Sequence, residues 1–113
     1  MRKGNKRFEE GIEVLQNGGT EVDLSNIRLT GAQVKKLGDA IGKSGKMTKL
    51  SAFGCGITDS GATALAQGIA KCPQLQELYL NDNQISDSGS TALAQGIAKC
   101  WQLQQLVLSN NQI

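Results

Sequence analysis

The chain contains no histidine, a single proline and few aromatic residues, and it has no long apolar run. Without histidine it lacks the commonest general base and metal ligand of enzymes. Its 3 cysteines form no C-x-x-C pair of the kind that binds zinc. No segment approaches the roughly 20 apolar residues that a membrane-spanning helix needs. We therefore expect no catalytic residues, no metal, no cofactor and no membrane segment.

The net charge and the cysteines further restrict the class of protein and its location. The 12 basic and 10 acidic residues give a net charge of +2, too small for the concentrated basic face of a nucleic-acid-binding protein. The first residues show no secretory signal, so the cysteines favour a reducing, cytoplasmic location. Cys72 and Cys100 could reach disulfide distance, but two small buried thiols are the commoner arrangement.

A repeat dominates the second half of the chain. TDSGATALAQGIAK at 58–71 returns as SDSGSTALAQGIAK at 86–99, identical at 12 of 14 positions. CPQLQELYLNDNQI at 72–85 returns as CWQLQQLVLSNNQI at 100–113, identical at 9 of 14, and the offset is 28 residues in both cases. A fixed period of this kind predicts a solenoid, in which each unit buries its apolar face against its neighbours.

Each unit combines a strand with a helix. The spacing L-x-x-L-x-L-x-x-N-x-I recurs in both units, first at Leu75, Leu78, Leu80, Asn83 and Ile85. Alternate residues of a strand point to one face, which predicts parallel strands at 21–24, 49–52, 77–80 and 105–108. Between them, the helix expected over 59–71 has an apolar stripe at Ala62, Leu65, Ala66 and Ile69.

Polar residues recur at the ends of these elements. Asp59 and Asp87 stand at the starts of two helices, where each carboxylate is expected to cap the amides that follow it. Asn83 and Asn111 stand where the chain leaves a strand. Their amides are expected to bond backbone groups of the turn and of the adjacent repeat, and Cys55 takes this position one unit earlier.

The L-x-x-L-x-L-x-x-(N/C)-x-I segment followed by a D-x-G-x-x-x-L-A helix resembles the ribonuclease-inhibitor-like leucine-rich repeats. That family includes ribonuclease inhibitor, the Ran GTPase-activating proteins and the sensor regions of NOD-like receptors. The resemblance covers residues 19–113. It implies an α/β fold, a right-handed leucine-rich-repeat solenoid of about 3.5 repeats, with parallel strands on the concave face and helices on the convex face. It also implies that the usual task is recognition of a protein partner.

The expected organisation is one repeat domain preceded by a short helix. Phe8, Ile12 and Leu15 form a single apolar stripe, so residues 1–18 are expected to form a helix that caps the solenoid. The same stripe could instead dock on a partner. The repeats then run over 19–46, 47–74 and 75–102, with a partial repeat at 103–113.

Alternate strand positions face away from the helices and form an open surface. Phe53 and Tyr79 are diagonal neighbours there, with Val107 beside Tyr79. Aromatic residues with a polar rim have the composition of an interface centre, although exposed apolar residues also occur on ordinary surfaces. The candidate partner-binding residues are Lys49, Ser51, Phe53, Glu77, Tyr79, Asn81 and Val107, with Trp101 at the edge before the last strand.

The last strand is followed by no helix that would cover it in this sequence. An open edge that favours strand addition is therefore expected at Leu103, Leu106, Leu108 and Ile113. Either the chain is a fragment of a longer array, or two copies form a homodimer with residues 105–109 antiparallel. A remote alternative, from the resemblance, is a regulator like the Ran GTPase activators, for which Arg28 lies near the relevant turn. The sequence favours a non-catalytic module that binds a protein partner, which it does not identify.

Overall fold

A computed structural model of the chain describes residues 3–113, in which helices alternate with short strands. The helices are α1 (Lys3–Gln16), α2 (Gly31–Ser44), α3 (Asp59–Ile69) and α4 (Asp87–Ile97). The strands are β1 (Glu21–Asp23), β2 (Lys49–Ser51), β3 (Glu77–Tyr79) and β4 (Gln105–Val107). Residues 1–2 of the predicted capping segment lie outside the described residues. None of the helices in the described part is long and apolar enough to cross a membrane.

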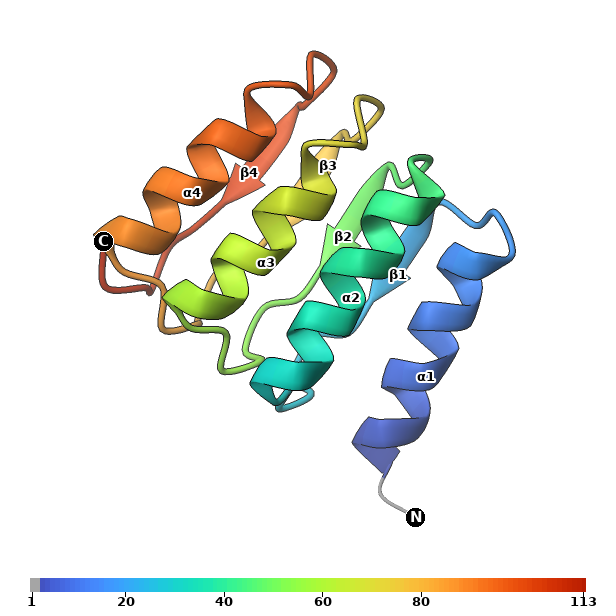
Figure 1. Ribbon diagram of the computed structural model, residues 1–113. Coiled ribbons are helices and arrows are strands. Elements are labelled where there is room, and N and C mark those ends of the chain that lie inside the picture. Colours follow the sequence, from blue (N-terminus) through green and yellow to red (C-terminus); the bar gives the residue numbers. More distant parts are fainter. Residues whose placement is uncertain (1–2) are drawn as a thin grey trace.

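The strands form one parallel sheet in the order β1-β2-β3-β4. The register advances by one repeat at each step, pairing Val22 with Leu50, Leu50 with Leu78 and Leu78 with Leu106. The helices lie along one face of this sheet and leave the other face uncovered (Figure 1). The predicted α/β solenoid is therefore confirmed. Each strand ends one residue earlier than predicted, and α3 ends at Ile69.

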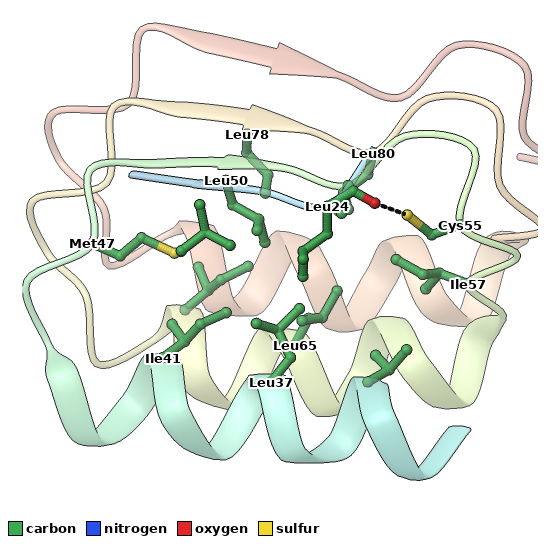
Figure 2. Close-up of a cluster of buried hydrophobic side chains, with 14 of the residues drawn as sticks. Leu24, Leu37, Ile41, Met47, Leu50, Cys55, Ile57, Leu65, Leu78 and Leu80 are labelled. Atoms are coloured by element: carbon green, nitrogen blue, oxygen red, sulfur yellow. Dashed lines mark hydrogen bonds between the residues drawn. The ribbon is translucent and has the colours of Figure 1, made fainter. Parts of the chain in front are cut away.

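The core is a dry apolar layer between the sheet and the helices. Leu24, Leu50 and Leu78 are all 0 % exposed. Figure 2 shows these side chains, from the strands and the residue after β1, pointing toward Leu37 of α2 and Leu65 of α3. Burying each such side chain stabilises the fold by about 1.5–3 kcal/mol.

Glycine lets neighbouring helices approach to backbone contact. A Cβ atom added at Gly68 on α3 would overlap the carbonyl oxygen of Gly38 on α2. One added at Gly96 on α4 would lie 2.6 Å from the carbonyl oxygen of Ala66 on α3. The small residues of the repeat therefore determine how closely α2, α3 and α4 pack.

Asn83 joins consecutive repeats where the chain leaves β3. Its Oδ1 accepts a hydrogen bond from the backbone N–H of Cys55 at 3.0 Å, and its Nδ2 donates to the carbonyl oxygen of Ala52 at 3.0 Å. Asn111 joins the next pair of repeats in the same way. At the equivalent position one repeat earlier, the Cys55 thiol donates to the carbonyl oxygen of Leu24 at 3.0 Å (Figure 2). The expected bonds between repeats are present.

The predicted role of Asp59 as the cap of its own helix is wrong. The N-cap of α3 is Thr58, and its side chain makes no capping bond. The Oδ1 atom of Asp59 instead accepts hydrogen bonds from the backbone N–H groups of Ser86 at 2.7 Å and Gly89 at 3.0 Å, at the start of α4. Asp87, at the equivalent position of α4, is exposed and bonds no following repeat in the described chain.

The apolar stripe of α1 is part of the core. Phe8, Ile12 and Leu15 are 1 %, 3 % and 2 % exposed. Arg7 also ties α1 to the chain after β1, because its Nη1 donates to the carbonyl oxygen of Ser25 at 3.2 Å. The stripe is therefore buried within this chain, and α1 lies beside α2 at the amino-terminal end of the row (Figure 1).

The cysteines are free and buried. Cys55, Cys72 and Cys100 form no disulfide. Burial is the main cause that raises the pKa of each thiol, because a thiolate is costly to remove from water. The repeat holds these residues as small apolar groups, as favoured from the sequence.

Candidate functional site

The uncovered side of the sheet, here called the open face, carries the alternate residues of the strands. Lys49 pairs with Glu77, and Ser51 pairs with Tyr79. Phe53 lies two residues beyond Ser51 and so stands diagonal to Tyr79. A hollow of about 500 Å³ lies on this face; it is lined by Glu21, Val22, Asp23, Lys49, Ser51, Phe53 and Tyr79.

Neighbouring charged groups hold the Tyr79 side chain in place. Its hydroxyl donates a hydrogen bond to Oε1 of Glu77 at 2.5 Å. The Nζ atom of Lys49 lies 5.9 Å from the centroid of the Tyr79 ring, within the range of a cation–π contact. The bond to Glu77 is the main cause that raises the pKa of Tyr79, so the phenol stays neutral and donates. These two contacts define the position of the ring on the open face.

The amino-terminal wall of the hollow is anionic. The backbone N–H of Ser25 donates to Oδ1 of Asp23 at 3.0 Å, and Nη2 of Arg7 lies 3.8 Å from the same oxygen. The bond from Ser25 is the main cause that lowers the pKa of Asp23, so this carboxyl is ionised at neutral pH. The side chain of Asp23 remains 71 % exposed and can still contact a partner.

Ser51 forms the floor of the hollow. It is only 8 % exposed, and its Oγ lies 2.7 Å from Oγ of Ser25, in the turn after β1, in a hydrogen bond between the two repeats. The predicted open-face position of Ser51 is correct, but its hydroxyl is already bonded. Its contribution to the site is the shape of the floor.

The remaining candidate residues lie around or away from the hollow. Val107 pairs with Tyr79 on the next strand. Asn81 follows β3 and donates from Nδ2 to Oδ2 of Asp82 at 2.7 Å. Trp101 lies outside the hollow, in the loop before β4, and is 91 % exposed. The structure thus brings Lys49, Phe53, Glu77 and Tyr79 together and leaves Trp101 at an edge.

The sequence-based candidates omitted two acidic residues that line the hollow. Glu21 and Asp23 occupy the same strand positions as Lys49 and Ser51, one repeat earlier. Alignment by the 28-residue period places both residues on the open face, and their acidic character beside Lys49 is the signal that could have included them.

The side chains of the open face are suited to noncovalent contacts with another molecule. It offers aromatic rings, two acidic groups and a lysine around one hollow. Within the described residues, His, Cys, Asp and Glu side chains form no group of three that could hold a metal ion.

The carboxyl-terminal edge carries less well covered apolar residues. Leu106 of β4 is 39 % exposed and Ile113 is 58 % exposed, whereas Leu78 in the preceding repeat is fully buried. Leu103 and Leu108 are partly buried against the core. In the described chain β4 pairs only with β3.

Sequence comparison identifies the repeat. A family model described as "Leucine Rich repeats (2 copies)" matches residues 73–113, and one described as "Leucine Rich repeat" matches residues 46–66. The chain contains leucine-rich repeats over these residues. A comparison of this leucine-rich-repeat chain with the curated proteins gave no match.

Solved structures confirm the fold of the leucine-rich-repeat chain. It is similar to the structure titled "Leiomodin-1 Actin-Binding Site 2 (ABS2)", with a TM-score of 0.82, 21% identity and coverage of 92% of this chain and 62% of that one. It is also similar to a Caenorhabditis elegans tropomodulin C-terminal domain, with a TM-score of 0.76, 22% identity and coverage of 87% and 61%. The chain thus spans less than two thirds of the length of either structure.

Proposed function

We propose that this chain is a non-catalytic interaction module that binds a protein partner through its open face. One observation carries the proposal: Phe53 and Tyr79 line one hollow of about 500 Å³. Aromatic side chains in the centre of a surface, surrounded by polar groups, are typical of residues that carry most of the binding energy of an interface. The leucine-rich-repeat family and the two similar structures support a protein-binding role.

The order of the Tyr79 ring supports its role as an anchor. Binding is weakened when side chains must be immobilised on association, at about 0.5–1.5 kcal/mol for each flexible side chain. The bond to Glu77 and the contact with Lys49 hold Tyr79 before binding. Asp23 and Glu21 would select a partner that places positive or hydrogen-bond-donating groups beside its apolar anchor.

A double substitution tests this proposal. We expect Phe53→Ala with Tyr79→Ala to weaken partner binding at least tenfold, because both rings are lost from one contact centre, while circular dichroism and thermal unfolding stay close to those of the original chain. Lys35→Ala, on the exposed side of α2, is the matched control and should bind normally. Partners would be captured by affinity purification with crosslinking at the open face. Capture that survives the double substitution would contradict the proposal.

Actin is the first purified protein to test. The similar leiomodin-1 structure is titled by an actin-binding site. Monomeric and filamentous actin would be tested by analytical ultracentrifugation and co-sedimentation. The expected result for an actin partner is binding that the double substitution removes. Binding that persists in the double variant would place the contact outside the open face.

A second candidate function is self-association through the carboxyl-terminal edge. The exposure of Leu106 and Ile113 favours it, together with the unpaired side of β4. Two copies would place residues 105–109 antiparallel across a twofold axis. Light scattering over a dilution series tests this, and Leu106→Lys should shift the equilibrium toward monomer. A chain that is soluble and monomeric at every concentration would exclude the pairing.

The remaining assignments belong to the same proposal. Residues 1–18 act as the amino-terminal cap, followed by the repeats 19–46, 47–74, 75–102 and 103–113. The three free buried thiols support a cytoplasmic location. A GTPase-activating role would rest on Arg28 alone, an exposed residue beside Gly56, and we do not assign it.

A further inference from the structure

One lysine recurs at the same repeat position in three consecutive units. Lys43 lies in the last turn of α2, and Lys71 and Lys99 follow the ends of α3 and α4. All three side chains are exposed. Within the part of the chain that the structure describes, none of them forms an ion pair with a carboxylate. The carboxyl-terminal ends of α2, α3 and α4 lie along one edge of the molecule (Figure 1). The solenoid therefore has a row of unpaired positive charges at this edge.

These lysines border shallow grooves between the helices. Lys43 and Lys71 both line a groove of about 240 Å³ between α2 and α3, and Lys99 lines one of about 290 Å³ between α3 and α4. Lys43 and Lys46 also line a groove of about 670 Å³ between α1 and α2. Across the three linings the only carboxylate is that of Asp39. The row is therefore strongly positive, with small residues as its floor.

Trp101 lies at the end of this row. It stands two residues after Lys99, in the loop that enters β4, and is 91 % exposed. The preceding repeat has Pro73 at this position. Helix dipoles account for cations at helix carboxyl ends, a contribution of about 0.3–1 kcal/mol each. They do not account for an indole ring that is almost wholly in water, and Trp is strongly enriched among residues that dominate binding energies.

The geometry points to a second binding surface: we propose that the edge formed by Lys43, Lys71, Lys99 and Trp101 binds an extended acidic segment of a protein partner. Packed helices lie about 8–10 Å apart, so the lysines recur at about that interval. A peptide in the extended polyproline II conformation has three residues per turn and advances about 3.1 Å per residue, so every third side chain lies on the same face and meets the next lysine. The matching sequence has Glu or Asp at every third position and an apolar residue at the end that reaches Trp101.

Two synthetic peptides of equal composition test the register. One carries three Glu residues at every third position with Gly and Ser between them and a terminal Leu, and the other carries the three Glu residues consecutively. Trp101 is the only tryptophan of the chain, so its fluorescence reports contact at the end of the row. We expect the spaced peptide to bind at least fivefold more tightly and to change this fluorescence. Raising the salt concentration should weaken the binding, because exposed charges are screened.

Substitutions locate the contact. Lys71→Gln removes the central charge and should weaken binding of the spaced peptide about threefold to fivefold, the range of one exposed ion pair. The triple change at Lys43, Lys71 and Lys99 should weaken it more than tenfold. Lys35→Gln, on the same layer of helices but outside the row, is the matched control. The double change at Phe53 and Tyr79 should leave peptide binding intact, which separates this surface from the open face.

Three outcomes would overturn this inference. The first is equal affinity for the two peptides, which would show that the spacing of the Glu residues does not matter for binding to the lysine row. The second is calorimetric binding of the spaced peptide with unchanged Trp101 fluorescence. The third combines two results: the chain binds neither peptide, but it adsorbs to phosphatidylserine vesicles and the triple variant does not. That result would assign the lysine row to binding of a membrane surface.

Discussion

Oδ1 of Asp59 on α3 lies 3.0 Å from the backbone nitrogen of Gly89, whose N–H donates to it at the start of α4. The first backbone N–H groups of a helix have no partner within that helix. An aspartate of one repeat thus caps the helix of the next repeat, and Ser86 donates to the same carboxylate through its backbone and its hydroxyl. Consecutive units are joined at the helix starts as well as at the strand ends.

The first prediction concerns this link and its pH dependence. Hydrogen bonds, chiefly from Ser86, lower the pKa of Asp59. A carboxyl with a lowered pKa in the folded state stabilises the fold above its unfolded pKa, and this stabilisation is lost as the pH falls through the folded pKa. We expect Asp59→Asn to lower the free energy of unfolding at about pH 7 and to have little effect at about pH 2. Urea denaturation at both pH values measures this difference.

Asp87→Asn is the matched control for that experiment. Asp87 occupies the same position in α4 but is exposed and caps no following helix in the described chain. Its substitution should leave the free energy of unfolding nearly unchanged at both pH values. Equal losses at the two positions would mean that the charge at a helix start matters and the bonds to the next repeat do not.

The second prediction concerns Asn83. Its amide bonds buried backbone groups of two repeats, including the N–H groups of Cys55 and Ile57. A buried group that loses its partner costs about 1–3 kcal/mol, and Asn83→Ala leaves more than one such group unpaired. We therefore expect a loss of at least about 2 kcal/mol in urea denaturation. Gln84→Ala, at the exposed neighbouring position, should change the stability little; similar losses in both variants would contradict a specific role for the buried amide.

The third prediction concerns the contact between helices. In Gly68→Ala the new methyl group would overlap the carbonyl oxygen of Gly38, so α2 and α3 must move apart. Overpacking of this kind costs about 1–3 kcal/mol. A Cβ at Gly31 meets no atom within 4 Å, so Gly31→Ala should instead stabilise the chain, by about 0.4–1 kcal/mol. Thermal unfolding of the two variants should show shifts of opposite sign, and shifts of the same sign would contradict this assignment.

The fourth prediction concerns Tyr79. Because the chain has a single tyrosine, the ultraviolet absorbance of phenolate reports on Tyr79 alone. The bond to Glu77 stabilises the neutral phenol, and the negative carboxylate opposes the phenolate, so both raise the pKa of Tyr79. We expect Glu77→Gln to lower this pKa toward the ordinary value of about 10. Glu21→Gln, which removes another negative charge from the hollow, should leave the pKa of Tyr79 nearly unchanged. A comparable fall of this pKa in Glu21→Gln would mean that the total negative charge of the hollow, and not the bond to Glu77, raises it.

The period of the repeat explains why so much of the fold could be predicted from the sequence. Once Leu78 and Leu106 are known to be equivalent, their pairing in adjacent strands follows, and so does the face on which Lys49 and Glu77 lie. The cap made by Asp59 could not be predicted in the same way. Local rules assign a capping residue to its own helix, whereas this bond depends on the separation of two packed helices.

The candidate site was partly predictable for a related reason. Strand register placed Phe53 and Tyr79 as diagonal neighbours, but register does not give side-chain conformations. The hydrogen bond from Tyr79 to Glu77 and the hydrogen bond between the hydroxyls of Ser51 and Ser25 depend on those conformations. The hollow itself became apparent only in three dimensions, although the repeat already places Asp23 on the open face beside Ser51.

The glycines between the helices also influence the curvature of the sheet surface that a partner would contact. Strands of a sheet lie about 4.8 Å apart, whereas helix axes need about 8–10 Å, and this mismatch bends a row of such units into an arc with the helices on the outer rim. Contact at Gly38, Gly68 and Gly96 keeps the outer rim short, which gives the arc a large radius. A broad, gently rounded protein fits the inner rim of such an arc better than a narrow projection does.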